Sequence, residues 1–342
     1  MPPTPPLMKL QDLTVDFDIG DRYVRALHGV DLEIRRGETL GIVGESGCGK
    51  SITWLAALGL LSRSSKVAGS AQFDGQELLN IAPRSLSRIR GSRIALIFQD
   101  PSSSLNPVHR IGRQISEALR LHRGMVGADA RHEARHLLDR VGISNAGQRL
   151  NEYPHELSGG MNQRVMIAMA LAGEPDLLIA DEPTTALDAT IQAQILDLLR
   201  SLQEETGMAM ALISHDLGVI ADMSDRVAVM YCGRIIEEAT TAELFQAPTH
   251  PYTRGLLDAL PDLDGPRRRL EAIPGSVPAP DALPPGCAFA RRCKHVREIC
   301  EQTPPRLQKL TGAPKRCAAC HRLEALWLPP APTTPIYERA DA

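Results

Sequence analysis

Short apolar runs rich in β-branched residues alternate with helical patterns along most of the chain. Four such runs, each bounded by glycine or polar residues, predict buried strands: Thr39–Val43, Arg93–Gln99, Leu177–Ala180 and Met210–Ser214. In Thr190–Thr206 the apolar residues instead recur on one face, which predicts a helix. Strands that alternate with helices are typical of a mostly parallel sheet, so the pattern predicts an α/β core.

The two ends of this core have different patterns. Residues 1–8 are rich in proline and predict a disordered lead, and residues 10–33 predict strands around a turn. Near the other end, Val227–Tyr231 and Arg234–Glu238 flank a Cys-Gly pair, which predicts a β-hairpin.

Two changes in pattern indicate the domain organisation. Residues 101–173 are mainly helical without a clear strand, which predicts an inserted helical subdomain. After Pro248 prolines become frequent and no further strand is predicted. We therefore expect a main domain over residues 9–248, a second domain over 249–323 and a loose tail over 324–342.

Composition limits the classes of function. The chain has 342 residues, a formal net charge of -3 and no excess of basic residues that would favour a nucleic-acid surface. Neither a signal peptide nor a run of about 18 apolar residues is evident, so we expect a cytosolic chain unless a partner holds it at a membrane. Disulfides are rare in that compartment, so the seven cysteines need another explanation.

A glycine-rich loop follows the first predicted strand. Gly44–Ser51 is GESGCGKS, which fits the phosphate-binding pattern G-x-x-x-x-G-K-[ST] between a strand and a helix. In such a loop backbone N–H groups and a helix N-terminus bind phosphate oxygens, the lysine contacts the β- and γ-phosphates and the serine ligates Mg²⁺. The predicted ATP-binding residues are Gly44, Glu45, Ser46, Gly47, Cys48, Gly49, Lys50 and Ser51, with Cys48 acting through its backbone.

Two carboxylates follow the third predicted strand. Pro175–Pro183 is PDLLIADEP, which places Asp181 and Glu182 at the carboxyl end of that strand, where α/β sheets bind ligands. We expect Asp181 to hold Mg²⁺ and Glu182 to orient or deprotonate the attacking water, because phosphoryl transfer needs charge neutralisation and a positioned nucleophile.

Three further motifs indicate the family. Leu157–Met161 is LSGGM, Gln99 ends a strand in IFQDPSSSLNP, and His215 ends another in LISHD. Together with the glycine loop and the carboxylates, in this order, they resemble the ABC ATPase family over about residues 8–245. The resemblance implies ATP hydrolysis by a P-loop cassette with a parallel sheet core, an antiparallel β subdomain and an inserted helical subdomain.

The resemblance also implies roles for single residues. Glu182 and His215 would be catalytic, and Gln99 would contact Mg²⁺. The signature residues would act on ATP held by a partner subunit; they are Leu157, Ser158, Gly159, Gly160 and Met161.

Two further contacts also follow from the resemblance. Asp188 would belong to the D-loop, Ala186–Asp188. The adenine would stack on Phe17, with Tyr23 as the alternative.

The C-terminal part narrows the family. His250–Pro261 (HPYTRGLLDALP) and Ile273–Cys293 look like the tail of ATPases in the dipeptide and oligopeptide importer family, which also serves nickel and some glycosides. This resemblance implies a peripheral subunit at the cytoplasmic face of a bacterial inner membrane. Its partners would be a second ATPase subunit, two permease subunits and an extracytoplasmic substrate-binding protein. A heterodimer of ATPase subunits is favoured, and a homodimer remains open.

Other classes of function fit the sequence less well. Soluble ABC proteins of the ribosome usually carry two cassettes in one chain, and DNA-repair relatives contain long coiled coils or zinc modules. Neither feature is visible here. A module that binds ATP without hydrolysis is disfavoured, since Glu182 and His215 are both present.

Five of the seven cysteines crowd into the C-terminal part. Cys287, Cys293, Cys300 and Cys320 match a cysteine motif of many importer ATPases of this branch, and Cys317 could replace Cys320. Four thiolates suit zinc or an iron–sulfur cluster, and spacing wider than in ordinary zinc knuckles favours the cluster. Some relatives are understood to hold a [4Fe–4S] cluster there, so we expect a structural metal staple.

Overall fold

A computed structural model describes residues 5–100, 104–185, 187–259 and 272–326. Its centre is an eight-stranded sheet with the strand order β11-β12-β10-β9-β3-β8-β7-β6. The strands from β9 to β6 run parallel, as the apolar runs predicted. They are β3 (Thr39–Val43), β6 (Ile94–Ile97), β7 (Leu177–Asp181), β8 (Ala209–Ile213) and β9 (Arg226–Tyr231), and the antiparallel hairpin partner of β9 is β10 (Arg234–Thr240).

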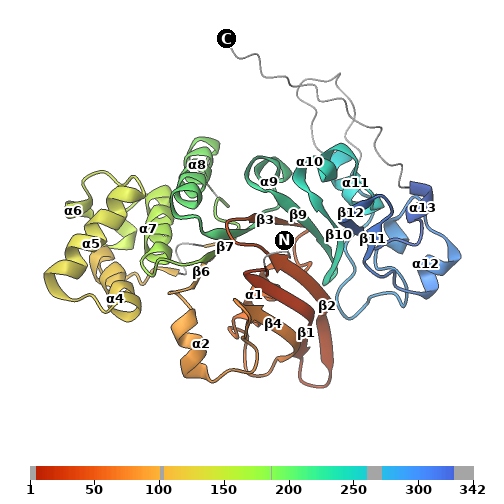
Figure 1. The fold of residues 1–342 in the computed structure, drawn as a ribbon, viewed down its shortest axis with the longest axis horizontal. Helices are drawn as coiled ribbons and strands as arrows, with labels where there is room; N and C mark the ends of the chain where they lie inside the picture. Colours follow the sequence, from red (N-terminus) through yellow and green to blue (C-terminus); the bar gives the residue numbers. More distant parts are fainter. Residues whose placement is uncertain (1–4, 101–103, 186, 260–271, 327–342) are drawn as a thin grey trace, which may run out of the picture.

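A second, antiparallel sheet lies beside the first (Figure 1). Its strands are β1 (Met8–Asp18), β2 (Tyr23–Ile34), β4 (Lys66–Phe73) and β5 (Gln76–Glu77). The disordered lead predicted over residues 1–8 is wrong at its end: Leu7 and Met8 are 2% and 1% exposed. Leu7 also donates its backbone N–H to the carbonyl of Ile34, because two apolar residues after the prolines can join the core. Residues 1–4 lie outside the described part.

The predicted helical insertion forms a separate lobe, shown in yellow and green in Figure 1. The insertion contains helices and no strand among residues 104–173. Residues 101–103, at its predicted start, lie outside the described part. The elements of the lobe are α4 (Ile111–Arg123), α5 (Gly127–Arg140), α6 (Ala146–Arg149), the 3₁₀ helix η1 (Pro154–Glu156) and α7 (Gly159–Leu171).

The remaining helices of the main domain pack around the sheets. The predicted helix after the glycine loop is α1 (Lys50–Ala57), and that over residues 190–206 is α8 (Ala189–Thr206). The others are α2 (Pro83–Ile89), α9 (Leu217–Met223) and α10 (Thr241–Gln246).

The residues after 248 are here called the C-terminal extension. The expectation that they contain no strand is wrong, because two strands form there. Strand β12 of the extension pairs antiparallel with β10, and β11 pairs with β12, so both strands continue the main sheet. The structure describes residues 249–259 and 272–326 of the extension. Residues 327–342, most of the predicted tail, lie outside the described part. The elements of the extension are α11 (Pro251–Asp258), η2 (Ala290–Arg292), α12 (Glu298–Gln302), β11 (Gln308–Leu310), β12 (Ala313–Ala318) and α13 (Leu323–Leu326).

Two apolar cores flank the main sheet. One joins the antiparallel sheet, α1 and one face of the main sheet around the buried Trp54. The other joins the helical lobe and α8 to the opposite face, and it includes Tyr252 and Phe289 of the extension. The extension is therefore built onto the same core as the main domain, and the predicted α/β fold with an antiparallel subdomain and a helical insertion is confirmed.

Candidate nucleotide-binding site

The glycine loop lies between the carboxyl end of β3 and the start of α1. Gly44, Gly47 and Gly49 have φ of 155°, 78° and 109°. A Cβ on Gly44 would lie 2.2 Å from the carbonyl oxygen of Met230, and one on Gly49 would lie 2.7 Å from the Leu27 side chain. Only glycine fits these two positions, which lets the loop turn tightly so that backbone N–H groups can face an anion.

Lys50 is only 6% exposed. Its ammonium donates to the carbonyl oxygen of Gly44 at 2.8 Å and to that of Glu45 at 3.2 Å. The charge is thus held inside the curve of the loop, where phosphate oxygens can replace the carbonyl acceptors. The Cys48 side chain packs into the apolar core, so this loop residue can contact a phosphate only through its backbone.

Asp181 connects the loop to the strand that carries the carboxylates. Burial raises the pKa of Asp181, while a hydrogen bond with Ser51 and the charge of Lys50 act in the opposite direction. The structure therefore brings together two of the three predicted Mg²⁺ contacts, the hydroxyl of Ser51 and the carboxylate of Asp181. Hard oxygen donors of this kind are what Mg²⁺ prefers.

Three side chains converge on Glu182. Gln99 donates its amide N–H to Glu182 Oε2 at 2.8 Å, Thr185 donates its hydroxyl to the same oxygen at 2.9 Å, and His215 Nδ1 lies 3.4 Å from it. Gln99, Glu182 and His215 follow β6, β7 and β8, which are neighbours in the sheet. Residues far apart in sequence thus form one polar cluster at the carboxyl edge.

The backbone of Glu182 is also unusual. Its φ is 49°, in the left-handed region that non-glycine residues rarely adopt, and its N–H donates to the carbonyl of Ile213 at 3.0 Å. Such conformations cost free energy and concentrate at functional sites. The pairing with β8 holds the carboxylate at the edge of the sheet.

The signature residues lie on the helical lobe, away from the glycine loop in front of α1 (Figure 1). Ser158 caps α7 by accepting a hydrogen bond from the N–H of Met161 at 3.3 Å. Leu157 is buried, whereas Ser158 and Gly159 are exposed at the helix N-terminus, and Gly160 packs against Ile191.

The remaining predicted contacts vary in setting. Asp188 caps α8 by accepting from the N–H of Ile191, and Ala186 lies outside the described residues. Phe17 packs against the core beside the antiparallel sheet. Tyr23 is 48% exposed with the Lys66 ammonium 3.6 Å from its ring centre. The stacking of adenine on Phe17, or on Tyr23 as the alternative, stays a prediction.

The four cysteines predicted as metal ligands line one small cavity in the extension. Cys287, Cys293, Cys300 and Cys320 surround a space of about 20 Å³, and burial raises the pKa of the Cys287 thiol to about 11. Cys317 instead lies on β12 opposite Glu238. Within the described residues, no three histidine, cysteine, aspartate or glutamate side chains are arranged as a metal site. The four thiols thus lie around one space, but their side chains are not arranged as the metal site expected from the spacing.

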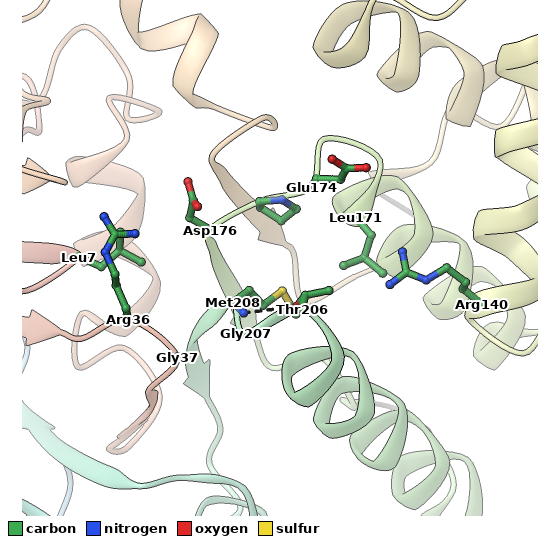
Figure 2. A pocket seen from close by; sticks show the side chains of 11 residues that line it. Leu7, Arg36, Gly37, Arg140, Leu171, Glu174, Asp176, Thr206, Gly207 and Met208 are labelled. Atoms are coloured by element: carbon green, nitrogen blue, oxygen red, sulfur yellow. Dashed lines mark hydrogen bonds between the residues drawn. The ribbon is translucent and has the colours of Figure 1, made fainter.

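Another cavity lies at the opposite edge of the sheet (Figure 2). It has a volume of about 350 Å³ and is lined by Gly37, Asp176 and Met208, which precede β3, β7 and β8. No residue predicted for the nucleotide site lines it. Ligands of open α/β sheets bind at the carboxyl ends of the strands, so this cavity is not the candidate site.

Sequence reasoning missed two groups of residues around the site. Thr185 holds Glu182, and its position three residues later could have suggested this contact. Arg292 pairs with Glu45 at 2.9 and 3.0 Å, and the hydroxyl of Tyr252 accepts a hydrogen bond from the N–H of Glu45 at 2.9 Å. No sequence signal connects residues that are 247 positions apart.

A glycine loop, a carboxylate pair, a glutamine, a histidine and a separate LSGG helix on this sheet define an ATPase of the ABC type. The model of the family described as "ABC transporter" matches residues 27–185, and that described as "Oligopeptide/dipeptide transporter, C-terminal region" matches residues 236–300. The oligopeptide transport ATP-binding protein OppD of Salmonella typhimurium is 49% identical over 92% of this chain and 93% of its own length. AppD of Bacillus subtilis, another oligopeptide transport ATP-binding protein, is 48% identical over 93% and 97%.

Solved structures agree with this similarity. The ATP-binding cassette MJ0796, a dimer in a post-hydrolysis state bound to ADP and phosphate, is 31% identical with a TM-score of 0.62, covering 68% of this chain and 98% of its own. The protein cbiO1 from Clostridium perfringens, part of the cbiONQ transporter complex, is 30% identical with a TM-score of 0.60, covering 71% and 92%.

The chain belongs to the family of ABC transporter ATP-binding proteins of the oligopeptide type. It is an ATP-hydrolysing subunit of a transporter, and its substrate is ATP with Mg²⁺. None of the helices in the described residues combines the length and hydropathy needed to cross a bilayer.

Proposed function

We propose that this chain powers a bacterial importer of di- or oligopeptides from the cytoplasmic face of the inner membrane. The observation that carries the hydrolytic part is the convergence of Gln99, Thr185 and His215 on the Glu182 carboxylate. A protein that only binds ATP has no need for a held carboxylate at this edge. The peptide cargo is supported by the C-terminal region match over residues 236–300 and by relatives named as oligopeptide transport proteins.

In this proposal the glycine loop and Lys50 bind the phosphates of ATP. Ser51 and Asp181 hold Mg²⁺, which neutralises phosphate charge when bound. Glu182 accepts a proton from the attacking water, and His215 orients the γ-phosphate and that water. Gln99 hydrogen-bonds to Glu182, and exchange of its side chain between this carboxylate and the Mg²⁺ site would report the nucleotide state.

We further propose that each ATP is completed by the signature of a second ATPase subunit. The exposed N-terminus of α7 at Ser158 and Gly159 is a polar anion site that its own glycine loop does not use. A chain with one glycine loop and one such helix fits a head-to-tail pair of ATPase subunits, with a heterodimer favoured. Two permeases and a substrate-binding protein would complete the importer.

The composite site is tested by Ser158→Arg. The added bulk and charge should prevent ATP-induced pairing, while ATP affinity of the full-length chain stays within about twofold of wild type. Size-exclusion chromatography with ATP and titration calorimetry measure the two properties. Ser201→Arg, at an exposed serine on α8, is the matched control and should pair normally. Parallel loss of ATP binding in Ser158→Arg would show that the signature acts within one chain.

The cargo is tested with the assembled importer in vesicles. Labelled di- to pentapeptides should be accumulated on addition of ATP, and nickel and glycosides should not. Uptake of nickel or a glycoside instead would replace the peptide assignment and leave the ATPase role intact. Co-purification with ribosomes or DNA rather than with membrane proteins would overturn the transport role itself.

We retain an iron–sulfur cluster in the extension as a separate proposal. Its support is that Cys287, Cys293, Cys300 and Cys320 line one cavity, since thiols are the ligands such clusters use. Protein purified without oxygen should be brown and contain iron and acid-labile sulfide, and Cys293→Ser should remove the colour while ATP still binds. One tightly bound zinc would replace the cluster, and metal-free protein with a folded extension would exclude both.

A further inference from the structure

The C-terminal extension contacts the phosphate-binding loop directly at Glu45. The guanidinium of Arg292 donates to both carboxylate oxygens of Glu45, at 2.9 and 3.0 Å. This is the parallel, two-bond geometry in which arginine binds carboxylates most strongly. The side chains of Arg292 and Glu45 are 7% and 27% exposed, so the pair is only weakly screened by water.

Arg292 is itself held in place from several sides. Its Nε donates to the carbonyl of Pro274 at 2.9 Å, and one terminal nitrogen also donates to the hydroxyl of Tyr231 at 3.3 Å. The guanidinium carbon lies 5.9 Å from the ring centres of Tyr231 and Phe289. All three nitrogens have acceptors, so the guanidinium is held in its orientation toward Glu45.

A second contact from the extension holds the backbone of Glu45. The Glu45 N–H donates to the hydroxyl of Tyr252 at 2.9 Å, and Tyr252 is fully buried on α11. The carbonyl of Glu45 accepts from the Lys50 ammonium at 3.2 Å. Glu45 therefore joins the extension on one side to the phosphate-contacting lysine on the other.

We propose that Arg292 and Tyr252 are positioning residues for ATP binding: they hold Glu45, neutralise its charge and keep the glycine loop open for phosphate. Glu45 is the second residue of the loop, so its carboxylate lies close to where the polyphosphate binds. An uncompensated negative charge there repels ATP, because charges at short distance interact strongly when partly desolvated. The inference rests on the proposed phosphate-binding role of residues 44–51, and it gives the extension a part in nucleotide affinity.

A purely structural role for Arg292 leads to a different expectation. If the arginine only attached the extension to the main domain, Arg292→Ala would already break that attachment, and removing Glu45's charge as well would not restore ATP affinity. If the arginine neutralises Glu45, removing that charge should instead relieve the first defect. Recovery of ATP affinity in the double variant therefore separates the two roles.

The experiment measures ATP affinity of the full-length chain by titration calorimetry with Mg·ATP. Arg292→Ala should weaken binding by about tenfold, as expected for truncation of one partner of a buried charge pair. Arg292→Ala combined with Glu45→Gln should recover most of that loss, and Arg292→Lys should recover part of it. Arg291→Ala, at the exposed neighbouring arginine, is the matched control and should bind as wild type does.

The outcomes are decisive in both directions. Wild-type affinity in Arg292→Ala, or a double variant that binds no better than Arg292→Ala alone, would overturn the inference. If Arg292→Ala does not fold, Tyr252→Phe removes one loop contact while keeping the ring, and an unchanged affinity there would overturn it equally. Wild-type protein that fails to bind Mg·ATP would overturn the proposed function instead, so the two failures are distinguishable.

Discussion

The nucleotide site and the C-terminal extension lie on one eight-stranded sheet, but they differ in how far their polar side chains are exposed to solvent. At the nucleotide site Gln99 and His215 are exposed and share the carboxylate of Glu182. Where the extension meets β10, Arg316 of the extension lies 3.6 Å from Glu237 of β10, and both side chains are 1% exposed. The Glu237 carboxylate also accepts the backbone N–H groups of Thr249 and His250, at 2.7 and 2.8 Å.

This difference indicates what each charge does. Exposed polar groups at the carboxyl edge of the sheet can still bind a ligand. Replacing them should therefore lower ATP turnover more than it lowers the free energy of unfolding. The buried charges of Arg316 and Glu237 pair with each other inside the protein, so replacing one of them should change stability. Three predictions test this contrast, taken from the largest expected effect to the smallest.

Glu182→Gln should lower ATP turnover of the assembled transporter by ~10²–10⁴-fold, because an amide cannot accept the proton of the attacking water. The free energy of unfolding should change little, since glutamine can keep the hydrogen bond to Thr185. Phosphate release and urea unfolding measure the two quantities.

Lys50→Ala is the matched variant for the previous substitution. It should abolish ATP binding, since the phosphates lose their fixed counter-charge, whereas Glu182→Gln should still bind ATP and pair with its partner. Full turnover by Glu182→Gln would show that another group is the base.

Glu237→Ala should lower the free energy of unfolding by about 3–5 kcal/mol, because it breaks the buried pair with Arg316 and removes the acceptor of the Thr249 and His250 N–H groups. Urea denaturation followed by circular dichroism measures the loss. Glu205→Ala is the control: Glu205 is 62% exposed and pairs with Arg140 at the surface, so its removal should cost under about 1 kcal/mol. Equal losses in both variants would remove the distinction between buried and exposed charge.

His250→Asn should flatten the dependence of stability on pH. Burial lowers the pKa of His250 from 6.5 to about 3, so the folded protein keeps this imidazole neutral. Below pH 6.5 the unfolded chain binds a proton that the folded chain does not. Stability is therefore complete above that pH and is lost as pH falls, by about 2 kcal/mol between pH 7.5 and 5.0 from this group alone.

Urea unfolding at these two pH values measures the change. Asparagine can still cap α11 at this position, as the imidazole does for the N–H of Tyr252. His28, whose pKa burial lowers to about 4, should leave a residual dependence on pH in the variant. His136→Asn, on the exposed face of α5, should keep the wild-type slope, and an unchanged slope in His250→Asn would contradict the assignment.

The nucleotide site could be predicted from sequence because each part is local. Gly44–Ser51 and Asp181–Glu182 directly follow apolar strands, and parallel strands bring their carboxyl ends to one edge. The convergence of Gln99 and His215 on Glu182 follows from the same topology, although the strand order itself needed the structure. The LSGG helix was recognisable only in the company of the other motifs.

The extension could not be predicted in the same way. Ala313–Ala318 has the sequence APKRCA, without alternating apolar residues, and it forms β12 only because β10 offers an edge to pair with. Leu7 and Met8 follow a run of prolines that masks their place in the core. The contact between Arg292 and Glu45 depends on a fold that brings distant segments together, and neither residue type predicts this contact from the sequence.

The pairing of β12 with β10 also affects the behaviour of the protein at high concentration. An uncovered β10 would present a row of free backbone N–H and C=O groups to other molecules, which is the template for intermolecular strand addition and aggregation. With the extension in place, the sheet instead ends at β11, a strand of only three residues, and at β6, a strand of four. The residues after 248 thus cover the edge of β10. A chain truncated at residue 248 should precipitate although its ATP-binding motifs are intact.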